Sequence, residues 1–451
     1  MLDAYLYNGL RTPFGRHAGA LARMRPDDML AAVIAEIVRR SPFDPEKIED
    51  VVVGCANQAG EDSRCVGRHA GALAKMRPDD MLAAVISEVV KQSRFDAEKI
   101  EDVVVGCANQ AGEDSRCVAR HAGLLAGLPI EVAGSVLQRN CGSGLNAIVM
   151  AAQAVTCGEG EVMVAGGVES MSRAPFVMNK AETPFSRDGR IYDSTIGARF
   201  PNPRIEGQFG ADTMPETADN LARDYQITRE ACDIFAEASQ RKYAKGKADG
   251  FFDGEILPVE VPGGRAGPVK VAEDEHPRPQ SDLAALARLR PLQEGGVTTA
   301  GNASGINDGA VAMIVASRKA GDAVGAEPLA RVLASGVAGV PPRIMGIGPV
   351  EASKKALARA GLSLSDIDVI EINEAFAAQV LSCLRGLELS FDDSRVNMNG
   401  GAIAVGHPLG ASGPRIALTA ARQLKRTGGR YALVTMCVGV GQGIAAVLER
   451  I

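Results

Sequence analysis

Residues 48–66, IEDVVVGCANQAGEDSRCV, contain a short run of branched apolar residues, a polar turn with a glycine and the start of a second helix. Just before this stretch, residues 27–40 (DDMLAAVIAEIVRR) carry apolar side chains at helical spacing. A helix followed by such a strand is typical of crossover units, in which helices connect parallel strands. The stretch therefore predicts an α/β fold with a mainly parallel sheet.

The same 19 residues recur at 100–118, inside a longer repeated block. Residues 15–66 and 67–118 agree at 45 of their 52 positions, and removing one copy leaves 399 residues. Because crossovers fix the order of strands, two nearly identical units cannot both fill one place in a sheet. One copy is expected to be extra. The second copy runs directly into the next predicted element and is favoured as the native one, although the first also follows its preceding strand directly.

The rest of the chain divides into segments that differ in composition and in hydrophobic pattern. Strand-like apolar runs alternate with helical patterns up to about residue 171 and again from about residue 328. Between residues 172 and 301 the chain is rich in Pro, Gly, Asp and Arg, with only short helical patterns. Long insertions of this kind often carry ligand contacts. We expect an insertion placed between two halves of an α/β body.

The composition excludes several classes of protein. The 451 residues are 46% hydrophobic and carry a formal charge of −6, which disfavours nucleic-acid and anionic-membrane surfaces. No secretory signal is evident at the N-terminus. Residues 431–448 lack charges, but glycines interrupt them, so they predict two buried strands rather than a membrane span. Nine cysteines without a C-x-x-C pair indicate neither a disulfide framework nor a metal site, and favour a reducing cytoplasm.

The first motif with chemical potential is LQRNCGSGLNAIVMAAQAV, residues 137–155. Cys141 lies between an apolar run and a helix, beside the unpaired N–H groups of the helix N-terminus, which favour a thiolate. The glycines that follow are expected to let a substrate approach the backbone. Cys141 is therefore a candidate nucleophile, and a buried cysteine in a glycine-rich turn is the alternative.

The second motif is VNMNGGAIAVGHPLGASGPR, residues 396–415. It embeds His407 among glycines, with no charged residue from Asn397 to Pro414. A histidine that is fixed among neutral neighbours is suited to act as a base near neutral pH. By itself, a loop histidine is more often structural.

Two shorter motifs are ambiguous alone. In CVGVGQG, residues 437–443, Cys437 ends a predicted buried strand, and the N–H groups that follow could line an oxyanion hole. In EINEAFA, residues 371–377, Asn373 and Glu374 are expected to open a helix, so Asn373 could be only an N-cap.

These four motifs in this order resemble the thiolase family, and so do GGVESMSRAPF (166–176) and TAGNASGINDGA (299–310). The resemblance covers nearly the whole chain, and family members are close to 400 residues long. It implies two similar βαβαβαββ halves in a layered α-β-α-β-α body with an inserted loop domain. The implied boundaries are 1–170 with 307–327, including both copies, for the N-terminal half, 171–306 for a CoA-binding loop domain, and 328–451 for the C-terminal half.

The resemblance implies a role for each candidate. Cys141 would carry the acyl group and His407 would activate it, while Cys437 would exchange a proton with the acetyl group. One oxyanion site would be His407 with a water held by Asn373. The other would be the N–H groups of Cys141 and Gly439. Two sites are needed because charge develops at two places, on the thioester carbonyl and on the enolate.

Coenzyme A would be a co-substrate, with no tightly bound cofactor and no metal. The resemblance places five residues along the pantetheine channel: Ala300, Gly301, Ser304, Ala375 and Phe376. Arg278 would lie near the nucleotide end of CoA. The implied assembly is a homotetramer or a dimer of dimers in the cytoplasm.

Within the family, segments such as GCANQAGEDSR and PPRIMGIGPV most resemble thiolases that act on 3-oxoadipyl-CoA in aromatic-compound catabolism. The products would be succinyl-CoA and acetyl-CoA. The distal carboxylate of that substrate calls for a cation, for which Arg173 and Arg199 are candidates. The alternatives are an acetyltransferase acting on acetoacetyl-CoA and an inactive CoA-binding protein impaired by the repeat.

Overall fold

The computed structural model describes residues 1–16, 21, 26–40, 50–54, 103–106, 112–115, 117–180, 183, 185, 187, 189–261 and 267–451. The strands of the main sheet are β1 (Ala4–Arg11), β2 (Gly15–Arg16), β3 (Asp50–Gly54), β4 (Val103–Gly106), β5 (Ser135–Leu137), β6 (Val162–Ser170), β11 (Asn307–Ala316), β12 (Ala330–Gly339), β13 (Val369–Ile372), β14 (Tyr431–Val438) and β15 (Gln442–Glu449). The helices of the body are α1 (Pro26–Arg40), α3 (Val118–Leu125), α4 (Ser143–Cys157), α9 (Arg318–Val324), α10 (Gly348–Ala360), α11 (Ala377–Gly386), α12 (Ala402–Val405) and α13 (Leu409–Thr427).

The sheet is mixed, so the expectation of a mainly parallel sheet was wrong. Its hydrogen-bonded order runs β13-β14-β15-β12-β1-β11-β6, followed by β3, β5 and β4. Parallel pairing joins β13 to β14 and joins β6 and β5 to β3 and β4. The pairs from β14 through to β6 are antiparallel, because β14 and β15 form a hairpin and β11 returns beside β6 after the long insertion.

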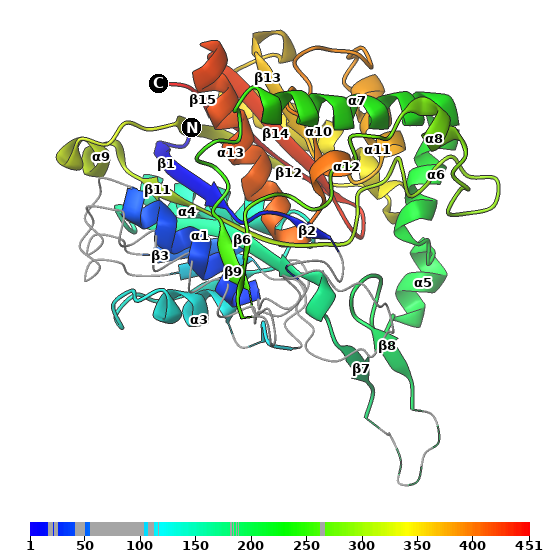
Figure 1. The fold of residues 1–451 in the computed structure, drawn as a ribbon, viewed down its shortest axis with the longest axis horizontal. Helices are drawn as coiled ribbons and strands as arrows, with labels where there is room; N and C mark the ends of the chain where they lie inside the picture. The colour runs from blue at the N-terminus through cyan, green and yellow to red at the C-terminus, as the bar shows by residue number, and fades with distance from the viewer. Residues whose placement is uncertain are drawn as a thin grey trace.

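Two helices form a central layer between the two halves. Helices α4 and α13 pack on each other and on strands of both halves, including β6 and β15. Both are buried over most of their surface, as expected for a central helix such as α4, which is apolar on most of its faces. Helix α1 covers the opposite face of β11 and β6, and α10 covers β12 and β15 (Figure 1). The predicted α-β-α-β-α layering is confirmed.

The uncharged tail forms β14 and β15, as predicted for two buried strands around a glycine turn. Val440 and Gly441 at the turn have φ angles of 66° and 79°, and Val440 is exposed. No helix in the described part of the chain is both long and apolar enough to cross a membrane.

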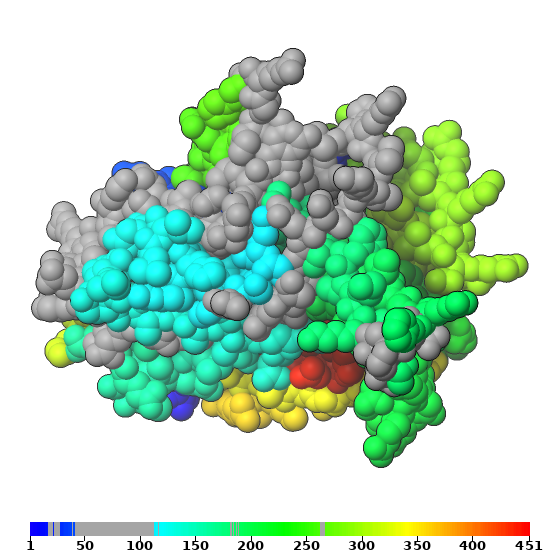
Figure 2. All heavy atoms as spheres, turned by 90° about the horizontal axis from the view of Figure 1, so that it is seen from below, coloured from blue at the N-terminus to red at the C-terminus, as the bar shows by residue number. Residues whose placement is uncertain are grey.

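The insertion between β6 and β11 contains β7 (Phe176–Met178), β8 (Ile191–Asp193), α5 (Pro203–Phe209), α6 (Met214–Asp224), α7 (Arg229–Ala248), β9 (Val259–Val261), β10 (Val269–Val271) and α8 (Leu283–Ala287). Most of these are short, but α7 has 20 residues, so the expectation of only short helices was wrong for this segment. Helix α7 packs on α11 and α12 of the body. The β7–β8 hairpin projects from the body as an arm (Figure 1), and Figure 2 views the molecule from the side toward which this arm extends.

Candidate active site

Cys141 lies in a tight turn between β5 and α4. Asn140, just before it, has a φ of 42°, and α4 begins two residues later with Gly142 as its N-cap. The Ser143 hydroxyl donates to Asn140 O at 2.6 Å and accepts from Arg139 N–H at 2.8 Å. These bonds fix the backbone on both sides of the cysteine. Cys141 therefore has the strand-to-helix position that the sequence predicted.

The Cys141 thiol is neutral in the resting protein. The residue is partly exposed, yet burial of its sulfur raises its pKa to about 11. A hydrogen bond from the Gly439 backbone lowers the pKa, and the carboxylate of Glu169 raises it. The expectation that the helix N-terminus alone would favour a thiolate was therefore wrong, because desolvation outweighs it.

The glycines beside Cys141 serve packing. A Cβ atom at Gly142 would lie 2.8 Å from Val438, and one at Gly144 would lie 2.1 Å from the carbonyl oxygen of Gly410. These positions therefore have to be glycine so that α4 can approach the β14 end and the start of α13. The expected role of these glycines in substrate approach stays a prediction beside this packing.

His407 is held by its backbone and is 4% exposed. Its N–H donates to Asn307 Oδ1 at 2.8 Å, and Asn307 in turn donates to Gly15 O at 2.8 Å. Gly406 has a φ of 101°, and a Cβ there would meet the Asn307 side chain. Burial, with a smaller contribution from the charge of Arg415, lowers the pKa of His407 to about 3. The imidazole is therefore neutral at physiological pH.

Ser412 sets the tautomer of His407. Its hydroxyl oxygen lies 2.6 Å from Nδ1 of His407 and donates to Pro408 O at 3.0 Å. When the single hydroxyl hydrogen of Ser412 points to Pro408 O, the contact with His407 is donated by Nδ1–H. In that tautomer Nε2 is the basic nitrogen, and it faces Asn373 Nδ2.

Asn373 faces the histidine and is not an N-cap. Helix α11 begins at Ala377 with Phe376 as its N-cap. The Asn373 N–H extends the β13–β14 pairing by donating to Thr435 O at 3.0 Å. Its side-chain Nδ2 lies 3.3 Å from Nε2 of His407. The expectation that Asn373 opens a helix was therefore wrong, and its side chain is available to the site.

Cys437 is 1% exposed near the end of β14. Burial, together with the nearby Cys141, raises its pKa well above the usual range of a thiol. Its side chain packs with Met345 and Ala375. A buried thiol with a high pKa holds its proton firmly until a base forms beside it.

Three contacts bring these elements together. Asn140 Nδ2 donates to Gly439 O at 3.0 Å, which joins the Cys141 turn to the turn after β14. Glu169 Oε2 accepts the N–H of Gly410 at 3.0 Å, and Glu169 also acts on the pKa of Cys141. The close approach of Gly144 to Gly410 completes the link to the His407 loop. These contacts link the Cys141 turn to the turn after β14 and to the His407 loop, and Asn373 contacts His407. That the five residues act as one catalytic site stays a prediction.

Two of the five predicted channel residues, Ser304 and Ala375, contact each other. Ser304 N–H donates to Ala375 O at 2.9 Å, and Ala303 forms a bridge with Phe376. Ala300 is exposed and Gly301 is partly exposed in the same loop. Arg278, near this loop in the sequence, has an exposed side chain, while its N–H donates to Gln240 Oε1 at 2.8 Å. An exposed cation suits a phosphate contact, which for Arg278 stays a prediction.

Arg173 is committed to a protein carboxylate. Its guanidinium makes two hydrogen bonds to Glu113, at 2.6 and 2.7 Å, and its side chain is 15% exposed. A bidentate pair of this kind fixes the plane of the guanidinium. Arg173 would therefore have to share its charge with any substrate carboxylate. Arg199 is partly exposed and stays a candidate.

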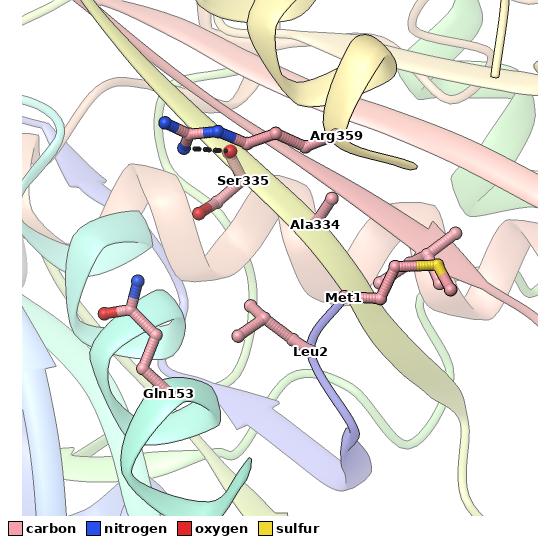
Figure 3. Close-up of a pocket in the computed structure, with 7 residues that line it drawn as sticks. Met1, Leu2, Gln153, Ala334, Ser335 and Arg359 are labelled. Carbon is pink, nitrogen blue, oxygen red and sulfur yellow. Dashed lines mark hydrogen bonds between the residues drawn. The ribbon is translucent and has the colours of Figure 1, made fainter. Parts of the chain in front are cut away.

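The cavity drawn in Figure 3 is separate from this site. It lies near the first residues of the chain and is lined by Met1, Leu2, Gln153, Leu333, Ala334, Ser335 and Arg359. Arg359 closes one side by donating to Ser335 O at 2.8 Å. None of the predicted catalytic or channel residues lines it.

Three residues of the site were missed by sequence reasoning. Asn307 and Ser412 hold the backbone and the ring of His407. His276 packs against Gly305, the residue that follows Ser304. A Cβ atom added at Gly305 would lie 2.3 Å from the ring of His276. Asn307 lies in a quoted motif, and Ser412 is five residues after His407, so only the spacing in those motifs could have indicated them.

Comparison with known proteins gives the family. The description "Thiolase, N-terminal domain" matches residues 5–76 and 63–319, and "Thiolase, C-terminal domain" matches 326–450. A 3-oxoadipyl-CoA/3-oxo-5,6-dehydrosuberyl-CoA thiolase from Escherichia coli K12 is 54% identical over 388 residues, 86% of this chain and 97% of that one. A beta-ketoadipyl-CoA thiolase from Acinetobacter baylyi is 47% identical over the full length of both chains.

Solved structures agree. The Bacillus anthracis acetyl-CoA acetyltransferase matches with a TM-score of 0.82 and 33% identity over 100% of this chain and 99% of that one. Human mitochondrial 3-ketoacyl-CoA thiolase in complex with CoA matches with a TM-score of 0.81 and 34% identity, over 100% and 98%. The fold, the two matching domains and these relatives together show that the chain belongs to the thiolase family.

Proposed function

We propose that this chain is a thiolase that cleaves 3-oxoadipyl-CoA with CoA to give succinyl-CoA and acetyl-CoA. The observation that carries the substrate is the 54% and 47% identity to relatives named for 3-oxoadipyl-CoA, also called beta-ketoadipyl-CoA. The gathering of two cysteines, a neutral histidine and an asparagine supports the chemistry. CoA is a co-substrate of the reaction.

The first half-reaction breaks the carbon-carbon bond. The Cys141 sulfur attacks the 3-oxo carbonyl as its proton passes to Nε2 of His407, the ring nitrogen that the Ser412 contact leaves free. The bond between C2 and C3 then breaks, which leaves a succinyl group on Cys141. The electron pair moves to the acetyl-CoA enolate, which takes its proton from Cys437.

The second half-reaction returns the enzyme to its starting state. Acetyl-CoA leaves, and the thiol of a new CoA gives its proton to the Cys437 thiolate. The CoA sulfur attacks the succinyl thioester, succinyl-CoA forms, and Cys141 recovers its proton from His407. Asn373, through a water shared with His407, and the N–H groups of Cys141 and Gly439 stabilise the two oxyanions.

The assay that tests this proposal is thiolysis of 3-oxoadipyl-CoA and acetoacetyl-CoA in parallel. A higher kcat/KM for 3-oxoadipyl-CoA is expected, because two relatives that are 54% identical are named for that substrate. A ratio in favour of acetoacetyl-CoA would select the acetyltransferase, which the likeness to the Bacillus anthracis structure keeps as the second candidate. No turnover of either substrate, by the chain or by a variant lacking residues 15–66, would reject thiolase activity.

The acid side of the pH profile is expected to be flat through pH 6.5. His407 has a pKa of about 3 in the folded protein, so the free enzyme keeps its base neutral well below the usual range. The measurement is kcat/KM between about pH 5.5 and 7.5. The unfolded chain binds this proton more readily, so stability falls with acidity below 6.5, and each assay needs a check that the protein stays folded. A fall in kcat/KM on the acid side that fits one ionisation near pH 6.5 would contradict the expectation.

Ser412→Ala is expected to lower kcat roughly ten- to a hundred-fold with little effect on KM. The alanine leaves Nδ1–H of His407 without its acceptor, so the ring can turn or change tautomer. Ser382→Ala is the matched control, since that buried hydroxyl also donates to the carbonyl four residues earlier in its helix, Ala378 O, at 2.8 Å. Equal losses in both variants would assign Ser412 a role in packing alone.

We expect the arm to form an interface between subunits of a tetramer or dimer of dimers. Its exposed apolar side chains include Met178, Ile191 and Phe185, which are 66%, 67% and 101% exposed. An apolar projection of this kind marks a contact surface. Met178→Ser with Ile191→Ser should reduce the mass seen in sedimentation, whereas Ile234→Ser, at an exposed position of α7, should not. An unchanged mass in the double variant would remove the arm from the interface.

A further inference from the structure

Two strands of this chain, β3 and β4, pair with the same residues of the same two neighbouring strands. Val52 of β3 and Val104 of β4 both pair in parallel with Ser135 of β5, and both pair with Ala165 of β6. Neighbouring strands lie about 4.8 Å apart, so the place between β5 and β6 has room for a single backbone. The two pairings are therefore alternatives.

The helix before this strand comes from the first copy. The carboxylate of Glu36 is buried and accepts from Arg39 and Arg40, and Arg40 also donates to Gly254 O at 2.6 Å. The second copy has Gln92 at the position of Arg40. It also has a serine, Ser87, at the position of fully buried Ala35, and a valine, Val89, in place of fully buried Ile37. Each difference favours the first copy in this helix position.

The connection after the strand comes from the second copy. Glu113 pairs with Arg173, and Asp114 is 4% exposed and accepts from Gly112 N–H at 3.2 Å. This segment leads directly to α3 and the Cys141 turn. The chain therefore passes from the first copy to the second somewhere between α1 and residue 112.

The strand between these two segments can come from either copy of the repeat. Residues 46–66 and 98–118 are identical over all 21 positions, so β3 and β4 offer β5 and β6 the same sequence. The two routes differ only in whether the surplus residues follow or precede the strand. The entropy of closing a loop depends weakly on its length, which leaves little free energy to choose between them. The N-terminal family description likewise matches twice, over 5–76 and 63–319.

We propose that β3 fills the place in some molecules and β4 in others, so that the protein exists in two interchangeable threadings with the same fold and the same site. The relevant property is redundancy. Either strand can be lost as long as the other remains.

Substitution by proline tests whether each strand can replace the other. Proline lacks the backbone N–H that a strand paired on both sides must donate, so its effect does not depend on side-chain contacts. Val52→Pro and Val104→Pro, each alone, should leave the yield of folded protein within about two-fold of the parent, since each blocks one of two equivalent states. The double variant should not fold. The measurement is soluble yield with thermal unfolding followed by circular dichroism.

The control is Val52→Pro in a chain lacking residues 67–118, which has only the first copy of the strand. It should fail to fold, while the same deletion without the proline should fold. If one single substitution is as damaging as the double and the other is silent, the chain has one threading and the proposal is overturned. Damage from both single substitutions, or a tolerated proline in the deletion control, would also overturn it.

Discussion

Cys141→Ser is expected to lower thiolysis by at least about a thousand-fold, with no acyl-enzyme detectable by mass spectrometry after incubation with substrate. The physical reason is the proton. The Cys141 thiol already has its pKa raised to about 11 by burial, and a serine hydroxyl in the same place is far less acidic. The neutral imidazole of His407 could not draw a proton from it at a useful rate.

Cys157→Ser is the matched control for this prediction. Cys157 lies at the other end of the same helix, α4, and is exposed. Its replacement should change neither kcat nor the mass of the acylated protein. Acylation of Cys141→Ser at the parent rate, located at another residue by peptide mapping, would show that the nucleophile is elsewhere.

The positions of the candidate residues at strand ends could be predicted from the sequence. In α/β folds the functional side chains often lie at the ends of strands. Cys141 follows β5, Asn373 follows β13 and Cys437 lies near the end of β14. Asn373 contacts His407, and Cys141 acts on the pKa of Cys437. The direction of the strands could not be predicted in the same way. The returning strand β11 pairs with β6 across an insertion, and nothing in its own sequence states that it runs antiparallel.

Errors at the site came from local rules that the tertiary structure overrode. Asn373 has the sequence of an N-cap, but its N–H is taken by Thr435 O, which keeps the chain extended until Phe376. Cys141 has the helix terminus that lowers a thiol pKa, but desolvation dominates. Ser412 was overlooked because its role depends on a ring five residues away across the turn that starts α13. Each needed the three-dimensional neighbours of the residue.

The sequence predicts that one copy of the repeat is extra, which stays a prediction, but the copy that supplies the helix is not the one that was favoured. We expected the second copy to supply the native unit, whereas the structure takes the helix from the first copy and the connection from the second. A few of the seven differences account for this choice of helix, namely those at Ala35, Ile37 and Arg40. Strands β3 and β4 have the same sequence, so their residues cannot favour one copy over the other. Both therefore pair in the same register with β5 and β6.

Cys437→Ser is expected to separate the two half-reactions. Cys141 and His407 are unchanged in this variant, so transfer of an acyl group from a simple acyl-CoA to Cys141 should proceed within about ten-fold of the parent rate. Cleavage and condensation should fall by at least about a thousand-fold, because the enolate has no acid of suitable pKa beside it. A serine hydroxyl buried at this position, where Cys437 is 1% exposed, neither gives nor takes the proton readily.

The decisive readout is exchange of the acetyl α-protons of acetyl-CoA with deuterated water, followed by NMR. The parent should exchange them and Cys437→Ser should not, while both form the acyl-enzyme. Cys232→Ser is the control, because that cysteine is also fully buried and is not among the groups that act on the pKa of Cys437. Full condensation activity in Cys437→Ser would assign the proton transfer to another group. Loss of acylation as well would mean that the second cysteine supports the first, since the nearness of Cys141 is among the causes that raise the pKa of Cys437.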